Sequence, residues 1–123
     1  MINVGATIAV VEDDEGVRTA LQQLLRSAGF RALTFESAEE FLADAARTAV
    51  ECLIADINLP GMSGVELVKR LGTNGNRMPS VLITGSRDAA TLELARQVAG
   101  VPRLNKPFSD EALFDVLEQV MGS

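Results

Sequence analysis

Residues 52–64, CLIADINLPGMSG, contain the stretch that decides the fold. The short apolar run CLIA is typical of a buried strand, and it leads directly into the carboxylate of Asp56 and then into a Pro-Gly turn. A carboxylate at the end of a buried strand costs folding free energy unless it is paired, so its presence there indicates a partner or a function. Asp56 is therefore the first candidate for a functional residue.

The composition bounds the class of protein. The chain has 123 residues, 47% hydrophobic and 23% charged, which indicates one globular domain large enough to bury its own core. We see no linker or repeat and expect a single domain over residues 1–123, without an output domain in this chain. Whether such a domain acts alone or belongs to a longer protein is left open by the sequence.

The amino-acid composition and charge also argue against several classes of function. The net charge is −6 without a basic cluster, which argues against a nucleic-acid surface, and no apolar run approaches the roughly 20 residues that cross a membrane. The single cysteine, Cys52, lies in an apolar run, so we expect no internal disulfide and a reducing, cytoplasmic setting. Histidine is absent, which removes the usual general base and the commonest ligand of transition metals.

Strand and helix patterns alternate along the whole chain. The predicted helices begin after residue 14, at the capping residues Ser37 and Ser63, near residue 88 and at Ser109, and the second of them carries Phe41, Leu42 and Ala45 inward. The fourth, about 88–98, is the least cleanly amphipathic. The predicted strands are 7–11, 31–35, 52–55, 80–84 and 101–105, the last of them a weak one whose Pro102 suits only a sheet edge.

Alternation of this kind predicts a parallel sheet with helices on both faces, in which ligands bind at the carboxyl ends of the strands. Polar side chains stand at four of those predicted ends. They are Glu12, Asp13 and Asp14 after the first strand, Asp56 after the third, Thr84 at the end of the fourth, and Asn105 with Lys106 at the end of the fifth.

This set of groups favours phosphoryl transfer onto a carboxylate. Crowded carboxylates repel one another unless a cation lies among them, and oxygen ligands without histidine favour a hard ion such as Mg²⁺. A carboxylate can act as the nucleophile, while a metal, an ammonium group and a hydroxyl neutralise the transferring oxygens. Asp56 is then the acceptor, with Thr84 and Lys106 as phosphoryl-stabilising groups. Because the chain has no histidine, a phosphohistidine donor must lie on another molecule.

These segments resemble the receiver domain of two-component response regulators over essentially the whole chain. VVEDD (10–14) is similar to the acidic pair of that family, DINLPGMSG (56–64) to its phosphoacceptor segment, LITGS (82–86) to its switch threonine segment, and NKPF (105–108) to its lysine-proline corner. The stretch LLRSAGFRALTFESAEEFL (24–42) resembles the nodulation- and nitrogen-fixation-type subgroup of these receivers.

The resemblance implies a flavodoxin-like (βα)5 fold of three layers with strand order 2-1-3-4-5. It implies a Mg²⁺ site formed by Glu12, Asp13, Asp56 and the backbone carbonyl of Asn58. It implies a phosphorylation switch within a two-component system or phosphorelay rather than an enzyme, with autocatalytic phosphotransfer and self-dephosphorylation as its only chemistry. The implied donor is a histidine kinase or a histidine phosphotransfer protein, and the implied output face consists of the fourth helix, the fifth strand and the fifth helix.

Two positions depart from the family pattern. The first acid is Glu12, a longer substitute for the usual aspartate. Arg103 stands three residues before Lys106, where the family usually has an aromatic ring that moves inward on activation. An arginine is costly to bury unpaired, so we expect Arg103 to face solvent and to contact a partner if it has a role.

Two other functions are compatible with parts of the pattern. A haloacid-dehalogenase-like phosphatase uses aspartyl-phosphate chemistry, but it needs an aspartate two residues after the nucleophile, where this chain has Asn58. A receiver-like interaction module that is not phosphorylated would fit the departure at Arg103, yet such a module is expected to lose part of the acidic pocket.

Overall fold

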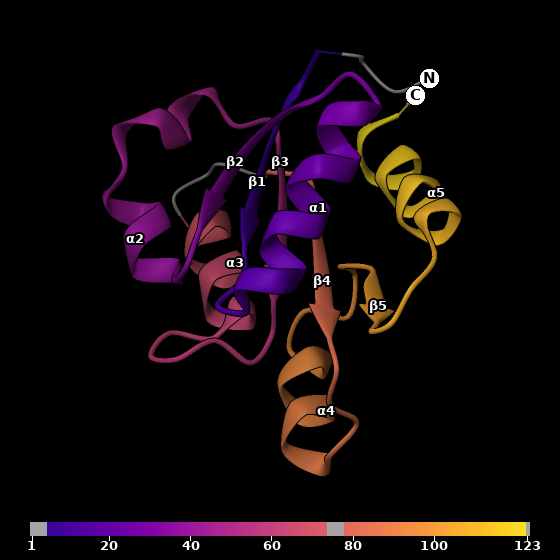
Figure 1. Cartoon of the computed structure of the whole chain (residues 1–123). Helices are drawn as coiled ribbons and strands as arrows, with labels where there is room; N and C mark the ends of the chain where they lie inside the picture. The colour runs from indigo at the N-terminus through magenta and orange to yellow at the C-terminus, as the bar shows by residue number, and fades with distance from the viewer. Residues whose placement is uncertain (1–4, 74–77, 123) are drawn as a thin grey trace.

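A five-stranded parallel sheet in the order β2-β1-β3-β4-β5 forms the centre of the computed structural model, which describes residues 5–73 and 78–122 (Figure 1). The order and the (βα)5 architecture confirm the fold implied by the resemblance; the ends of the predicted domain, 1–4 and 123, lie outside the described residues. The strands are β1 Thr7–Val11, β2 Arg31–Phe35, β3 Cys52–Asp56, β4 Ser80–Thr84 and β5 Arg103–Asn105. The helices are α1 Glu15–Ser27, α2 Ala38–Ala43, the short 3-10 helix η1 Ala45–Ala49, α3 Gly64–Thr73, α4 Ala89–Arg96 and α5 Asp110–Met121.

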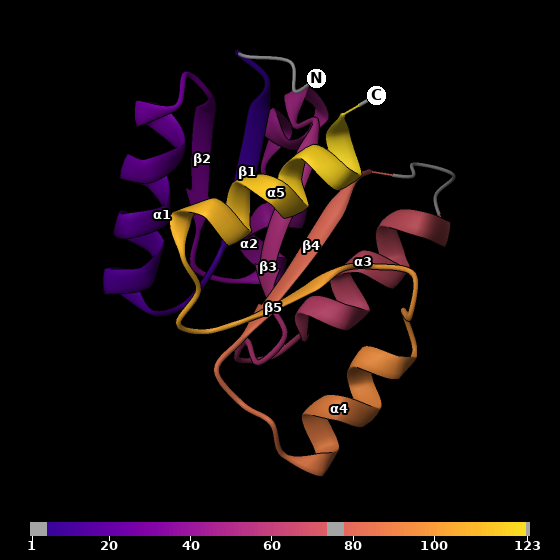
Figure 2. The ribbon, with the colours of Figure 1, turned by 90° about the vertical axis from the view of Figure 1, so that its right-hand side faces the viewer.

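Helices cover both faces of the sheet because the central strands are apolar on both sides (Figure 2). Leu21 and Leu25 of α1 and Leu113 and Leu117 of α5 pack on one face. Phe41 of α2 and the buried leucines of α3 pack on the other. Every residue of β3 and β4 is buried, so the ends of these strands are fixed by the core.

The predicted helix starts at Ser37, Ser63 and Ser109 are confirmed. Each hydroxyl accepts the backbone N–H three residues later at 3.0 Å, which satisfies one of the free amide groups of the first turn. Asp14 caps α1 in the same way, with its carboxylate accepting from the N–H of Val17 at 3.0 Å. Asp14 is thus a structural residue at the edge of the acidic cluster.

The structure corrects three details of the predicted elements. Ala45 does not face the core: α2 ends at Ala43, and Asp44 caps η1 through the N–H of Ala46 at 2.7 Å, which leaves Ala45 exposed. The fourth helix is shorter than expected and ends at Arg96. The fifth strand covers only Arg103–Asn105, because the N–H of Val101 donates to Val98 in a turn and Pro102 has no N–H.

Helix α4 lies beyond the carboxyl end of β4 rather than across a face of the sheet (Figures 1 and 2). Asp88 caps it, Thr91 and Ala95 are its buried residues, and Leu92 is 37% exposed. Ala95 joins the core cluster and Leu94 packs against it, while Thr91 adds polar contacts to the loop after β3.

Candidate functional site: an acidic pocket at the sheet edge

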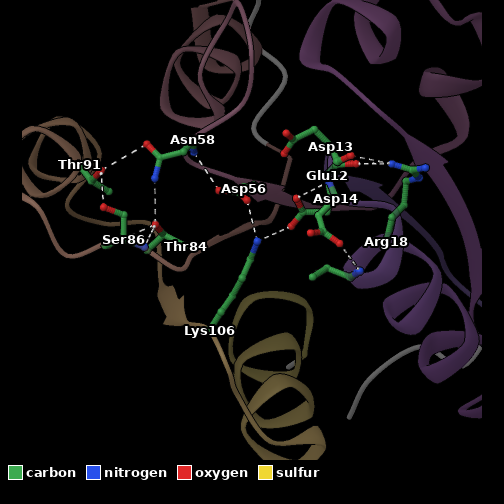
Figure 3. Close-up of polar contacts among 11 residues, drawn as sticks. Glu12, Asp13, Asp14, Arg18, Asp56, Asn58, Thr84, Ser86, Thr91 and Lys106 are labelled. Atoms are coloured by element: carbon green, nitrogen blue, oxygen red, sulfur yellow. Dashed lines mark hydrogen bonds and ion pairs between the residues drawn. The ribbon is translucent and has the colours of Figure 1, made fainter.

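Asp56 lies at the end of β3 and is only 5% exposed. Its Oδ2 accepts a hydrogen bond from Lys106 Nζ at 2.7 Å, and its Oδ1 accepts one from the backbone N–H of Asn58 at 2.9 Å (Figure 3). Lys106 reaches this point from the end of β5, just before the cis Lys106–Pro107 peptide bond. The predicted acceptor and the predicted lysine are thus brought into direct contact.

Glu12 is fully buried beside Asp56 and shares the same lysine. Its Oε1 accepts from Lys106 Nζ at 2.6 Å, and its Oε2 accepts from the N–H of Asp14 at 3.1 Å. Burial raises the pKa of Glu12 and the charge of Asp56 adds to the rise, while the hydrogen bond from Lys106 opposes it. Burial disfavours the charged form of Lys106, but its hydrogen bonds to Asp56 and Glu12 outweigh burial and raise its pKa. The ammonium therefore stays charged and bridges the two buried carboxylates. We call Glu12, Asp56 and Lys106 the charged pocket.

Asp13 completes the acidic cluster from the exposed side. One carboxylate oxygen from each of Glu12, Asp13 and Asp56 lies within 4.8 Å of the other two. Three hard oxygens at that spacing suit a cation such as Mg²⁺, so the donor set fits the ion that the family implies. The repulsion expected among these acids is partly relieved by Lys106, which the sequence had assigned to the phosphoryl group alone.

A second group of contacts, with neutral side chains at its centre, lies beside the charged pocket (Figure 3). The carboxylate of Asp88 adjoins this group and accepts from Ser86 Oγ at 2.8 Å. Thr84 Oγ1 accepts from the N–H of Ser86 at 3.0 Å and from Asn58 Nδ2 at 3.3 Å. Thr91 of α4 has its hydroxyl 3.3 Å from Asn58 Oδ1 and 3.4 Å from Ser86 Oγ. We call Asn58, Thr84, Ser86 and Thr91 the hydroxyl network. The predicted site residue Thr84 thus makes its hydrogen bonds within this network.

Sequence reasoning missed two residues that shape the pocket. Arg18 donates from one guanidinium nitrogen to the backbone oxygens of Glu12 at 2.8 Å and Asp13 at 3.4 Å, which holds the loop after β1. Gly64 starts α3 so close to β3 that an added Cβ would lie 2.2 Å from the carbonyl oxygen of Asp56. Gly64 was visible as the last residue of PGMSG (60–64), but only the structure shows this close approach. Nothing in the sequence pattern marked Arg18.

Arg103 and Cys52 lie outside the pocket. Arg103 is exposed on the edge strand β5. Cys52 is buried in the core, and burial raises the pKa of its thiol to about 12, so it is a packing residue.

A (βα)5 sheet whose carboxyl edge gathers carboxylates around one lysine defines a phosphoacceptor type of signalling domain. The family model described as "Response regulator receiver domain" matches residues 8–118, and the chain belongs to that family. Receiver domains are signalling switches of two-component response regulators, and the phosphatase and the unphosphorylated module are not favoured. In the part of the chain that the structure describes, none of the helices has the length and apolarity to span a bilayer.

Relatives include the transcriptional regulatory protein FixJ of Rhizobium meliloti, 36% identical over 113 residues, which cover 92% of this chain and 55% of FixJ. Nodulation protein W of Bradyrhizobium diazoefficiens is 36% identical over 112 residues, 91% of this chain and 49% of the relative. These matches agree with the subgroup that the sequence suggested. The chain spans about half the length of the curated relatives it matches.

Solved structures of the same fold agree. The crystal structure of FixJ-N has a TM-score of 0.80 at 35% identity and covers 94% of this chain and 92% of its own. Vibrio cholerae chemotaxis protein CheY4 has a TM-score of 0.82 at 27% identity and covers 94% and 98%.

Proposed function

We propose that Asp56 is the phosphoacceptor of this receiver domain and that its donor is a phosphohistidine on a histidine kinase or histidine phosphotransfer protein. The observation that supports this most directly is the contact of Asp56 Oδ2 with Lys106 Nζ at 2.7 Å. This contact lies at the end of β3, and Thr84 ends the neighbouring strand β4. Among the residues that the structure describes, Asp13 makes no such contact with a lysine.

In the transfer step, a carboxylate oxygen of Asp56 attacks the phosphorus of the donor. The new P–O bond forms as the P–N bond to the imidazole breaks, and the imidazole nitrogen takes up a proton. In this proposal Lys106 offsets the charge on the acyl phosphate, and the Thr84 hydroxyl donates to a phosphoryl oxygen after it leaves the carbonyl oxygen of Ser86.

We propose that Glu12, Asp13, Asp56 and the backbone carbonyl of Asn58 hold Mg²⁺ for this chemistry. When bound, the ion would neutralise the phosphoryl oxygens and the acidic cluster. Glu12 is held by Lys106 and by the N–H of Asp14, so it is the acid best placed to act through a water molecule. We also propose that the domain works in the cytoplasm, where Cys52 stays reduced.

For output we propose protein contacts of the face formed by α4, β5 and α5. A cavity of about 440 Å³ lies between α4 and β5 and is lined by Ala95, Arg96, Val101, Pro102, Arg103 and Asn105. Arg96 and Arg103 are exposed at this cavity, so an acidic partner surface matches its charge.

The phosphoacceptor is tested by mass spectrometry after incubation with acetyl phosphate and Mg²⁺. We expect one base-labile phosphate on the wild type and none on Asp56→Asn, because the amide keeps the shape and removes the nucleophile. Asp110→Asn, at an exposed acid in the first turn of α5, is the matched control and is expected to be phosphorylated like the wild type. Equal phosphorylation of Asp56→Asn would move the site elsewhere, with Asp13 next. A wild type that takes no phosphate would favour the unphosphorylated module.

A further inference from the structure

Helix α4 is connected to the acceptor loop by one buried side chain, Thr91. Thr91 is 3% exposed, and its hydroxyl lies 3.3 Å from Oδ1 of Asn58, a residue 33 positions earlier in the chain. A buried hydroxyl needs a partner, and the acceptors near it are Asn58 Oδ1, Ser86 Oγ at 3.4 Å and the carboxylate of the capping residue Asp88. Figure 3 shows Thr91 and Asn58 facing each other from opposite sides of the gap between α4 and the loop after β3.

Asn58 joins this contact to the charged pocket. Its backbone N–H donates to Asp56 Oδ1 at 2.9 Å, and its side-chain Nδ2 donates to Thr84 Oγ1 at 3.3 Å. A hydroxyl can donate and accept, so the amide can pair with Thr84 and Thr91 at the same time in either orientation. The acceptor carboxylate, Asn58 and α4 therefore form one continuous chain of polar contacts.

The chain also fixes where Thr84 points. Thr84 Oγ1 is already engaged by Asn58 Nδ2 and by the N–H of Ser86 at 3.0 Å. Its own proton is donated to the backbone carbonyl oxygen of Ser86 at 3.3 Å. To donate to a phosphoryl oxygen on Asp56, Thr84 must take this hydrogen bond away from Ser86, while Asn58 Nδ2 and the Ser86 N–H hold its oxygen in place. The distance of 3.3 Å from Thr84 Oγ1 to the Ser86 carbonyl oxygen is longer than the usual 2.7–2.8 Å of a hydroxyl hydrogen bond, so this contact is weak enough to exchange.

We propose that Thr91 is a positioning residue that holds the Asn58 amide against Thr84 and so ties α4 to the loop after the acceptor Asp56. The link between Asp56 and α4 then runs through Asn58 and Thr91 and does not need an inward side chain at position 103, where Arg103 is exposed. This inference rests on the proposed function of Asp56. It adds a residue of α4 whose hydroxyl sets how readily Thr84 is released.

The test compares Thr91→Val, which removes the hydroxyl and keeps the branched shape, with Thr91→Ser, which keeps the hydroxyl. Thr73→Val is the matched control, since the Thr73 hydroxyl contacts only a carbonyl of its own helix, Arg70, among the residues described. The first readout needs neither metal nor phosphate: exchange of the Ser86 amide hydrogen, followed by NMR. We expect it to be about fivefold faster in Thr91→Val, the factor that corresponds to about 1 kcal/mol, and unchanged in the other two variants.

The second readout is the rate of phosphorylation by acetyl phosphate in Mg²⁺. Easier release of Thr84 is expected to raise this rate by about two- to fivefold in Thr91→Val and to leave it at the wild-type level in Thr91→Ser and Thr73→Val. If Thr91→Val matches the wild type in both readouts, or if Thr91→Ser behaves like Thr91→Val, the inference is wrong. A wild type that takes no phosphate would instead refute the proposed function, and the Ser86 exchange would still test whether the Thr91 hydroxyl holds Thr84 and Ser86 in place.

Discussion

The charged pocket and the hydroxyl network are neighbours at the same sheet edge, yet they are held in very different ways. In the charged pocket, Lys106 Nζ lies 2.6 Å from Glu12 and 2.7 Å from Asp56. In the hydroxyl network, the side-chain contacts of Asn58 with Thr84 and Thr91 are both 3.3 Å. Short contacts between charged groups are roughly twice as strong as those between neutral groups.

The difference also follows the elements that carry the two groups. Glu12 directly follows β1 and Asp56 is the last residue of β3, and both strands are buried on both faces of the sheet. Thr91 belongs to α4, of which Thr91 and Ala95 are the buried residues, and Ser86 belongs to the loop before it. The charged pocket is thus built to stay in place while the hydroxyl network can rearrange, which is what a switch requires.

The largest effect is expected from breaking the charged pocket with Lys106→Met. The methionine keeps most of the stem, but Glu12 and Asp56 lose the cation between them. We expect a loss of about 3 kcal/mol in the free energy of unfolding at pH 7, at the low end for a broken buried pair because the Lys106 side chain is 21% exposed. Urea denaturation measures it, and Lys69→Met, at an exposed lysine of α3, is the control.

The pH dependence of this loss sharpens the comparison. The pKa of Glu12 is raised above its ordinary 4.5 in the folded protein, and removal of Lys106 takes away a contact that lowers it. Folding of the variant therefore takes up a proton, so the loss is greatest above the folded pKa and shrinks as the pH falls through it toward 4.5. A deficit that stays constant between pH 7 and 5 would show that packing, rather than charge, is lost.

A smaller stabilisation is expected when Mg²⁺ joins the charged pocket. Binding to the folded state alone stabilises by about 2.7 kcal/mol at a hundredfold excess over the dissociation constant. Asp13→Ala should remove most of this gain, since Asp13 is exposed and its loss leaves Lys106 paired. Thermal melts of the wild type and of Asp13→Ala, each with Mg²⁺ and with a chelator, measure this gain. Identical melts of the wild type under both conditions would refute the metal site.

The smallest effect is expected at Arg103, which lies outside both groups. Arg103→Ala should change phosphorylation and dephosphorylation rates little, and stability by less than about 0.5 kcal/mol, as is usual for an exposed site. Binding to an acidic partner surface should weaken, more at low salt than at high salt. Structures with and without a phosphoryl mimic complete the test: an Arg103 that turns inward on activation would make it part of the switch and weaken the role given to Thr91.

Much of the fold and of the charged pocket could be predicted from local patterns. The serines before α2, α3 and α5 act through groups three residues away, so a short window of sequence contains the whole interaction. The position of Asp56 in the charged pocket could be predicted because a parallel sheet brings the carboxyl ends of its strands together. Ala45 was predicted wrongly because the cap at Asp44 interrupts a helical pattern that otherwise continues.

What the sequence determined by itself is the type of each strand end: acids after β1 and β3, a hydroxyl on β4 and an amine after β5. Only the tertiary structure decided which of these groups touch. The contact of Lys106 with Glu12 joins residues 94 positions apart, and that of Thr91 with Asn58 joins residues 33 apart. Such contacts depend on distances of a few tenths of an ångström between elements, which are fixed by the packing of the core and leave no periodic signal in the chain.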